Sequence, residues 1–345
     1  MRIIAILPIQ GPLNGVKVIS QEILRVWDEK KINYQLIDTS QAKKFNQFGK
    51  FSFSKITQIT QLFWKLRKIK KNDFVYMNLT AHGYAFIRDF LIIKWLLFRN
   101  CNITIHLHES TLKKLQGKRI ISSLSKVKII IINDGQLEDL RPYYQNLTVV
   151  KNALPDYYAE HEFKIDTKTN KNIQLLSLSN LSVPKGSPLL YKIVNEIETK
   201  NLPYSITICG GVLDSESANI LSKIKDKNGV NLLDPIHDID KKMELYAEHD
   251  FLLFLSDENY EVYPLVYIEA LMNGVPIIST RQVISTDIIK GGGTHLVDDS
   301  IEKTIESVLK EKTLLTLRKE ARRKYEKEYD FQNYTSNILK IIYAT

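Results

Sequence analysis

The sequence predicts an α/β protein with two domains, each built on a parallel sheet with helices between its strands. Three observations lead to this prediction. Short apolar runs, typical of strands buried on both faces, alternate with helical spacers along the chain. A polar stretch at residues 156–171 interrupts the alternation near the middle of the chain, and the alternation then starts again. A length of 345 residues, 44% of them hydrophobic, is enough for two cores of ordinary size.

Each half of the chain has its own series of expected strands and helices. The strands of the first half are expected at residues 2–7, 34–37, 74–79, 103–107, 127–132 and 148–150. Helix-like segments lie between them at residues 16–27, 55–70 and 84–98. The strands of the second half are expected at residues 173–178, 204–209, 230–233, 251–255 and 275–279. The chain from residue 303 to about 343 is expected to be largely helical.

Composition argues against several classes of protein. The apolar run at residues 1–8 is too short for a signal peptide, which argues against an extracellular solute-binding protein with two lobes. No stretch approaches the ~20 apolar residues that a membrane span requires. Cys101 and Cys209, the two cysteines, both lie in apolar strand-like runs, so we expect buried thiols and no disulfide framework. These features predict a cytoplasmic protein.

Charge is distributed unevenly between the two halves. Residues 1–160 contain 25 Lys and Arg against 12 Asp and Glu, whereas the remaining residues are slightly acidic. A basic half indicates a nucleic acid or an anionic membrane surface as a partner. Residues 63–71 and 95–99 mix basic and aromatic side chains, as interfacial helices do. A solvated helix face beside a packed tryptophan explains the same pattern equally well.

The most informative stretch, residues 261–269, contains two glutamates and the expected start of a helix. Apolar runs at residues 251–256 and 275–280 flank it as strands. Pro264 is expected to be the first residue of the helix, and Gly274 to end it. Such a junction after a strand is where open α/β sheets bind their ligands.

The helix start predicts an anion site with carboxylates beside it. The backbone N–H groups of Leu265 and Val266 would point from the positive end of the helix dipole, where a phosphate binds well. Glu261 precedes the helix and Glu269 lies one turn inside it, so both would flank the phosphate. Ionised carboxylates accept hydrogen bonds, and sugar hydroxyls donate them. The alternative is a pair of surface glutamates on an ordinary helix.

Glu261 and Glu269, followed by Ala270 and the Gly-Val-Pro-Ile-Ile segment at residues 274–278, resemble the signature of retaining GT-B glycosyltransferases of family 4. These enzymes are also called group 1 glycosyltransferases. The resemblance implies two Rossmann-like domains that face each other across a cleft, with a C-terminal helix crossing back to the first domain. The first domain would comprise residues 1–155 and about 331–345, the linker residues 156–171, and the nucleotide-sugar-binding domain residues 172–330.

The resemblance also assigns roles to residues of the second half. It implies that Glu261 contacts hydroxyls of the donor sugar and Glu269 the ribose of the nucleotide, with Tyr263 as a further donor-binding residue. Lys185 matches the family lysine that faces the leaving diphosphate. At the family's arginine position this chain has Asn180, a neutral side chain that offers a weaker donor.

Glycines and histidines extend the resemblance to both halves. Gly210 is expected to bring backbone close to the nucleotide, and Asn14-Gly15 to meet the donor from the first domain, although an ordinary turn explains each. The glycine-containing segment at residues 11–15 does not match a dinucleotide-binding motif, so NAD is not expected. His108 matches the family histidine that contacts the donor sugar, whereas His106 is expected to be a packed histidine.

No metal or other cofactor is expected. His106 and His108 lie on one face of an expected strand, but no third ligand follows at close spacing. Asp238-Ile-Asp240 is similar to the metal-binding Asp-x-Asp of another class of glycosyltransferases. It precedes an expected helix, so helix capping is the better interpretation.

These observations predict a metal-independent, retaining glycosyltransferase. It would move a sugar from a nucleoside-diphosphate donor to a hydroxyl of a glycan or lipid-linked acceptor, as in the assembly of bacterial surface polysaccharides. His108, Glu261 and Lys185 would be its catalytic residues. The basic half would suit peripheral contact with the inner face of the plasma membrane, and nucleic acid is not expected. The alternatives are a nucleotide-sugar epimerase or hydrolase, and a binding subunit weakened by Asn180 and by Val262, where the family usually has glycine.

Overall fold

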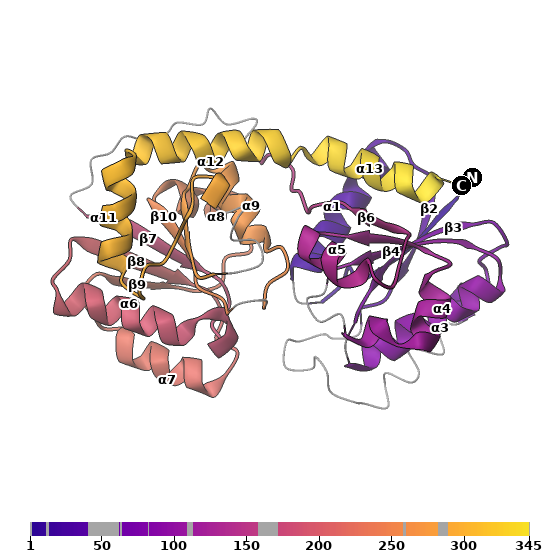
Figure 1. Cartoon of the computed structure of the whole chain (residues 1–345), viewed down its shortest axis with the longest axis horizontal. Helices are drawn as coiled ribbons and strands as arrows, with labels where there is room; N and C mark the ends of the chain where they lie inside the picture. The colour runs from indigo at the N-terminus through magenta and orange to yellow at the C-terminus, as the bar shows by residue number, and fades with distance from the viewer. Residues whose placement is uncertain are drawn as a thin grey trace. The chain divides into compact units, whose positions relative to one another are not determined.

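The computed structural model describes the chain at residues 2–11, 14–40, 62, 64–81, 83–108, 113–157, 172–257, 260–281 and 289–344. The chain divides into two compact units (Figure 1). The first unit consists of Met1–Pro155 together with Phe331–Thr345, and the second of Asp156–Asp330. Each unit is built on one parallel sheet of six strands.

The sheet of the first unit has the strand order β2-β1-β3-β4-β5-β6, with every neighbouring pair parallel. Its central strands are buried almost throughout, because they are apolar and helices cover the sheet. The strands are β1 (Ile3–Leu7), β2 (Tyr34–Asp38), β3 (Phe74–Leu79), β4 (Asn102–Leu107), β5 (Lys128–Ile131) and β6 (Leu147–Val149). The helices are α1 (Gly15–Glu29), α3 (Gly83–Phe98), α4 (Lys118–Leu124), α5 (Asp134–Leu140) and α13 (Phe331–Tyr343).

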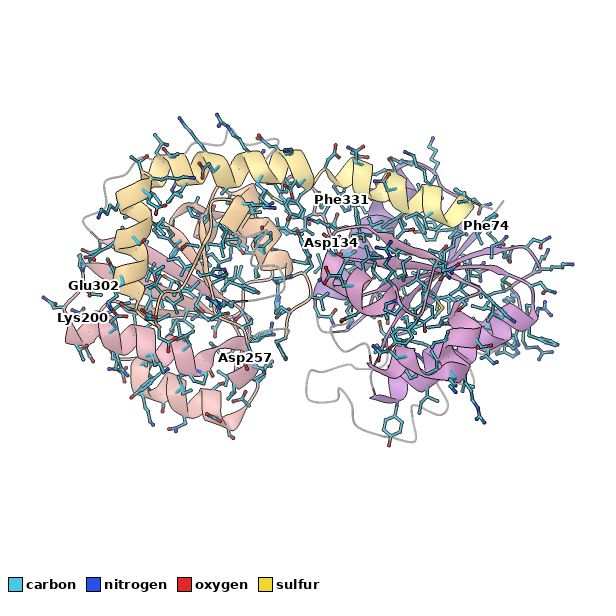
Figure 2. All side chains as sticks on the ribbon, viewed as in Figure 1. Phe74, Asp134, Lys200, Asp257, Glu302 and Phe331 are labelled. Carbon is cyan, nitrogen blue, oxygen red and sulfur yellow. The ribbon has the colours of Figure 1, made fainter. Side chains whose placement is uncertain are left out.

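The terminal helix α13 packs on the first unit, against β3 and β4. Phe74 of β3, labelled in Figure 2, meets Tyr343 of α13 edge to face with ring centroids 5.3 Å apart. Lys128 of β5 donates from Nζ to the carbonyl oxygens of Ile341 and Ile342, at 2.9 and 3.2 Å. These carbonyls have no acceptor role within the helix, so Lys128 caps its C-terminal end.

The sheet of the second unit has the order β12-β11-β10-β7-β8-β9, again with parallel neighbours. Its strands are β7 (Ile173–Leu178), β8 (Tyr204–Cys209), β9 (Val230–Leu233), β10 (Phe251–Phe254), β11 (Ile277–Ser279) and β12 (Thr294–His295). The helices are α6 (Ser187–Thr199), α7 (Ser215–Ile224), α8 (Ile239–Ala247), α9 (Leu265–Met272), α11 (Ile301–Glu311) and α12 (Leu314–Glu328).

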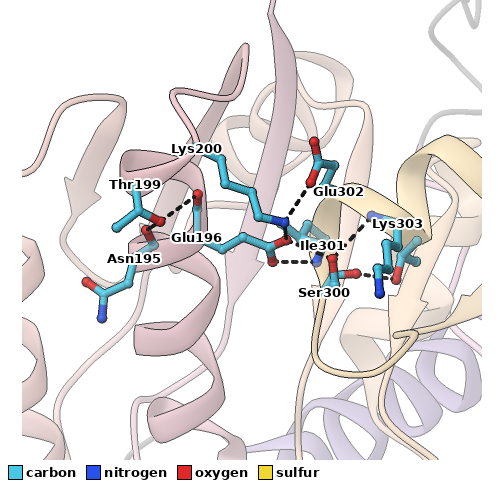
Figure 3. A network of polar contacts seen from close by, with 9 residues as sticks. Asn195, Glu196, Thr199, Lys200, Ser300, Ile301, Glu302 and Lys303 are labelled. Atoms are coloured by element: carbon cyan, nitrogen blue, oxygen red, sulfur yellow. Dashed lines mark hydrogen bonds and ion pairs between the residues drawn. The ribbon is translucent and has the colours of Figure 1, made fainter.

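A polar network joins α6 to the start of α11 (Figure 3). Glu196 accepts hydrogen bonds from the Ser300 hydroxyl at 2.7 Å and from the Ile301 N–H at 2.8 Å. Lys200 lies between two carboxylates, 2.9 Å from Glu196 and 2.6 Å from Glu302. A carboxylate of α6 therefore caps the N-terminus of α11, which fixes the two helices against each other.

Most strands lie where the sequence predicts them, with limited differences. β11 begins at Ile277 rather than at residue 275, and β12 was not predicted. Half of the residues of the helix expected at 55–70 lie outside the described residues. Cys209 is buried as expected, whereas Cys101 is half-buried, and both are free thiols. In the described part of the chain, no helix combines the length and apolar character needed to cross a membrane.

Candidate functional site

The candidate residues of the second unit gather at the C-terminal edge of its sheet. Asn180 and Gly210 follow the ends of β7 and β8, and Glu261 follows β10. β10, β7 and β8 are neighbours in the sheet. Because parallel strands end at the same edge, these three segments lie together where open α/β sheets bind ligands.

Gly186 shapes the turn that carries Lys185. A short 3₁₀ helix (Val183–Lys185) ends at Gly186, which has a φ of 86° and leads directly into α6. A Cβ atom at Gly186 would collide with the backbone carbonyl of Leu255. Only glycine combines this left-handed conformation with such a close approach of two loops.

The tight turn brings Lys185 and Glu261 together. Lys185 Nζ lies 2.9 Å from Glu261 Oε1, and both side chains are half-buried, 24% and 21% exposed. The cation and the carboxylate neutralise each other in the ligand-free protein. Both remain accessible enough to exchange this contact for one with a ligand.

The helix α9 starts beside Glu261. It begins at Leu265, so Pro264 is its N-cap residue and not the first helical residue, a difference of one position from the prediction. The Pro264 side chain makes no capping hydrogen bond to this helix end. Leu265 and Val266 occupy its first two positions, where backbone N–H groups have no acceptor within the helix. An anion beside these groups would gain both hydrogen bonds and the helix dipole.

Glu269 points into the second unit and is 5% exposed. Its Oε1 lies 2.7 Å from Lys242 Nζ, and its Oε2 accepts a hydrogen bond from the Tyr246 hydroxyl at 3.1 Å. Lys242 and Tyr246 both belong to α8. A carboxylate has about four lone-pair positions, so hydroxyl groups of a ligand could still bind to Glu269 beside these partners.

Lys242 and Tyr246 are functional candidates that the sequence did not reveal. Their spacing of four residues places them on one face of α8, but nothing in the sequence connects that face with Glu269. A buried carboxylate requires a counter-charge, and this general rule alone would have prompted a search for a basic partner of Glu269. The contact itself depends on how two helices pack.

The side chain of Tyr263, a predicted donor-binding residue, is buried in the second unit. It is 5% exposed, and its hydroxyl is hydrogen-bonded to that of Tyr329. Its ring also lies 6.0 Å from that of Tyr267. The side chain is therefore part of a buried aromatic cluster with Tyr267 and Tyr329.

Asn180 supports the backbone of the next loop. Its Oδ1 accepts a hydrogen bond from the Gly211 N–H at 3.1 Å. Gly210 has a φ of 154°, and a Cβ atom there would collide with the Ser179 carbonyl. The loops after β7 and β8 are thus in direct contact, and the amide of Asn180 is already engaged in holding them.

In the first unit, the candidates follow two strands that flank β3. Asn14 and Gly15 follow β1, and His108 directly follows β4. Asn14 caps α1, because its Oδ1 accepts a hydrogen bond from the Lys17 N–H at 3.0 Å. His108 packs against His106 with ring centroids 4.0 Å apart. Burial lowers the pKa of His108 to about 4, so its ring is neutral at pH 7.

The helix-capping interpretation of Asp238 is confirmed. Its Oδ1 accepts a hydrogen bond from the Lys241 N–H at 2.9 Å, at the N-terminus of α8. Within the described ranges, no group of three or more His, Cys, Asp or Glu side chains is arranged to hold a metal ion.

Comparison with known proteins relates this chain to glycosyltransferases. Residues 159–328 match the model of the family Glycosyl transferases group 1. No curated protein sequence matches the chain. Three similar solved structures cover 99% of this chain, at 13% to 15% identity, which is a similarity of fold.

Two of the three structures are described as glycosyltransferases, and the remaining one is a complex with UDP and glucose. One is WaaG, a glycosyltransferase involved in lipopolysaccharide biosynthesis, with 13% identity, a TM-score of 0.69 and 100% of its chain covered. Another is Anabaena Alr3699/HepE in complex with UDP and glucose, with 13% identity, a TM-score of 0.68 and 98% covered. The third is a glycosyltransferase from Rickettsia africae, with 15% identity, a TM-score of 0.66 and 97% covered. The predicted fold class is confirmed: the chain has the GT-B fold, and its residues 159–328 match the model of the group 1 glycosyltransferase family.

Proposed function

We propose that this protein is a retaining glycosyltransferase of family 4 that moves a sugar from a nucleoside-diphosphate donor to a hydroxyl group of a glycan or lipid-linked acceptor. The observation that carries the proposal is the ion pair of Lys185 and Glu261 beside the start of α9. The ion pair provides a cation and a carboxylate, and the start of α9 provides backbone N–H groups that have no acceptor within the helix. This is the set of groups that a sugar linked to a diphosphate needs.

Each group has a distinct task in this proposal. Lys185 and the N–H groups of Leu265 and Val266 stabilise the negative charge that develops on the diphosphate as the glycosidic bond breaks. Glu261 accepts hydrogen bonds from sugar hydroxyls, and Glu269 from the ribose. His108 of the first unit contacts the sugar as a neutral ring. The acceptor oxygen bonds to the anomeric carbon on the face from which the diphosphate leaves, and the departing phosphate accepts its proton, so no protein nucleophile or general base takes part. No metal ion is included in this proposal.

The donor is identified first by binding and then by turnover. The purified full chain is screened by thermal shift against a panel of nucleoside diphosphates and nucleotide sugars, because a ligand raises the melting temperature by mass action. Transfer is then followed with the stabilising donor and a panel of glycan and lipid-linked acceptors. We expect Lys185→Ala to lower the transfer rate by about 10²- to 10³-fold.

Lys192 provides the matched control, since it pairs with Asp299 on the exposed face of α6. Lys192→Ala is expected to retain transfer. Equal rates for Lys185→Ala, Glu261→Ala and the wild type would refute the assigned roles. Release of free sugar without an acceptor would indicate a hydrolase, an altered nucleotide sugar an epimerase, and tight binding without either product a binding subunit.

We further propose that the first unit binds an anionic membrane surface through α3. Ile87, Leu91 and Phe98 are 55%, 51% and 82% exposed, and with Lys94 they form one stripe at helical spacing. Arg99 lies over the ring of Trp95 at the end of the same helix. An exposed apolar stripe with basic neighbours suits a lipid surface better than water.

Vesicle sedimentation tests the membrane contact. The protein is expected to bind vesicles that contain phosphatidylglycerol more strongly than vesicles of phosphatidylcholine alone. Ile87→Glu with Leu91→Glu should weaken this binding. The control is Val212→Glu with Leu213→Glu, two exposed apolar positions of the second unit. Equal binding of both double variants would exclude α3 as the contact.

A further inference from the structure

Four aromatic side chains of the first unit pack in a row: Trp27, Tyr76, His106 and His108. His106 is fully buried, and its Nδ1 lies 2.7 Å from the Tyr76 hydroxyl of β3. On its other side, His106 packs against His108, with ring centroids 4.0 Å apart. Tyr76 in turn packs against Trp27 of α1, at 5.7 Å between centroids. The row therefore connects the rigid core of the first unit with His108.

The protonation of this row follows from its burial. Burial raises the pKa of Tyr76 well above its usual 10, with a smaller contribution from Tyr334 of α13, and lowers the pKa of His106 well below its usual 6.5, with a smaller contribution from His108. Both side chains are thus neutral. His106 Nδ1 is the one hydrogen-bond partner of the Tyr76 hydroxyl within the described residues, so the hydroxyl donates its proton there. The proton of His106 then lies on Nε2.

The row is costly for a purely structural element. The Nε2 atoms of both His106 and His108 are buried without a hydrogen-bond partner in the part of the chain that the structure describes. Each such atom destabilises the folded state by about 1–3 kcal/mol, and apolar side chains of the same shape would avoid the loss. Buried polar atoms without partners in native proteins require an explanation, and a functional role is one of the explanations.

We propose that Tyr76 and His106 are positioning residues that fix the orientation of the His108 ring. Tyr76 holds His106 in one orientation through its hydroxyl, and His106 provides the flat surface against which His108 packs. This inference rests on the proposed function only for the role of His108 toward the donor sugar. The positioning itself is a property of the ligand-free protein.

The matched variants are Tyr76→Phe and Tyr34→Phe. Both tyrosines pack against Trp27, at 5.7 and 5.6 Å, and both lose one hydroxyl hydrogen bond as phenylalanine. The hydroxyl of Tyr34 is bonded to Asp28, however, and that of Tyr76 to His106. A difference between the two variants therefore reports on His106 and not on aromatic packing.

The first measurement is an NMR titration of histidine-labelled full-length protein. In the wild type we expect His108 to titrate near pH 4 and the pKa of His106 to lie well below its usual 6.5. Tyr76→Phe should broaden or split the ring signals of both histidines and move the pKa of His108 toward its usual value, since a mobile ring admits water. Tyr34→Phe should reproduce the wild-type titration. Identical titrations in Tyr76→Phe and the wild type would overturn the proposal.

The second measurement is turnover with the donor found by screening. Tyr76→Phe is expected to lower kcat about tenfold or more with little change in KM, as expected when a group is displaced by a fraction of an ångström. His106→Phe keeps the packed ring but loses the hydrogen bond, and it should show the same kcat effect. Wild-type kcat in both variants would also overturn the proposal. If the wild type transfers no sugar, the proposed function fails, and the NMR titration still decides the positioning.

Discussion

Lys185 and Glu261 pair across two loops of the second unit, with Nζ 2.9 Å from Oε1. An incoming diphosphate would compete with Glu261 for this lysine. A sugar linked to the diphosphate would offer Glu261 new hydroxyl partners in return. In the proposed function, the pair would therefore distinguish a complete nucleotide sugar from a nucleoside diphosphate that lacks the sugar.

This competition gives a prediction with a definite sign. Glu261→Gln should raise the affinity for the nucleoside diphosphate by up to about fivefold, because half-exposed ion pairs contribute at most ~1 kcal/mol. The same variant should lower the affinity for the nucleotide sugar. Isothermal titration calorimetry measures both constants. Asp299→Asn, in an exposed pair with Lys192, is the control and should change neither. Weaker binding of both ligands to Glu261→Gln would contradict the competition.

Replacement of Gly186 by alanine should destabilise the second unit severely. Its φ of 86° costs an L-residue roughly 1–2 kcal/mol, and its Cβ would overlap the Leu255 carbonyl in addition. Gly211 has an ordinary φ, and its Cβ would meet Asn180 Oδ1 at an acceptable 3.4 Å. Urea unfolding followed by circular dichroism should show a loss of more than ~2 kcal/mol for Gly186→Ala and much less for Gly211→Ala. Similar losses in both would show that the loops rearrange at little cost.

The sequence predicts the sheets well because their strands are buried on both faces. Residues 74–79 and 173–178 are mostly apolar runs, interrupted only by Asn78 in the first and by Gln174 and Ser177 in the second, and β3 and β7 occupy those residues. Burial on both faces leaves a pattern that does not depend on which strand lies next door. By contrast, β12 has two residues, Thr294 and His295, and no apolar run to predict it.

The site is only partly predictable, because contacts between distant segments leave no local pattern. The resemblance places Glu261 and Lys185 at the same site, but their ion pair depends on a turn that only Gly186 allows. The direction of the Tyr263 side chain, into a cluster with Tyr329, follows from packing of α12 on α9. A sequence indicates which residue types a site needs and where strands end, but it does not indicate which side chains turn inward.

Lys128 should hold the terminal helix α13 in place. Its ammonium group caps the carbonyl end of α13, and hydrogen bonds to charged groups contribute about 1.5–3 kcal/mol. Lys128→Met keeps the buried stem and removes the donor, so amide hydrogen exchange in α13 should accelerate by about tenfold or more. Lys126→Met, at an exposed position two residues earlier, should leave exchange unchanged. Unchanged exchange in Lys128→Met would mean that apolar packing alone retains the helix.

The stability of the first unit should fall as the pH falls from 6.5 toward 4. His108 has a usual pKa of 6.5 that burial lowers to about 4, and burial lowers that of His106 in the same direction. Between these values the unfolded chain binds protons that the folded chain excludes, so each histidine removes up to ~1.4 kcal/mol per pH unit.

Tryptophan fluorescence reports this unfolding, since Trp27, Trp64 and Trp95, the three tryptophans, all belong to the first unit. Urea midpoints at pH 7, 5.5 and 4.5 should decrease less steeply for His108→Asn than for the wild type. Carboxylates titrate in the same range, but they contribute equally to both proteins, so the difference isolates His108. Parallel decreases would show that His108 is protonated in the folded state.

Asn180 stands where the resembled family has an arginine, so Asn180→Arg tests whether a missing cation limits the reaction. A guanidinium group there would add a positive charge near the leaving diphosphate and should raise the transfer rate by about tenfold or more. It would also remove the acceptor of the Gly211 N–H, which costs about 1 kcal/mol of stability. Asn180→Ala removes the same acceptor without adding charge and is the matched control. Faster transfer in the arginine variant and slower transfer in the alanine variant would assign the effect to charge. Slower transfer in both would instead show that the hydrogen bond between the loops after β7 and β8 matters more than a second cation, so that Asn180 serves this chain by holding the Gly211 backbone in place.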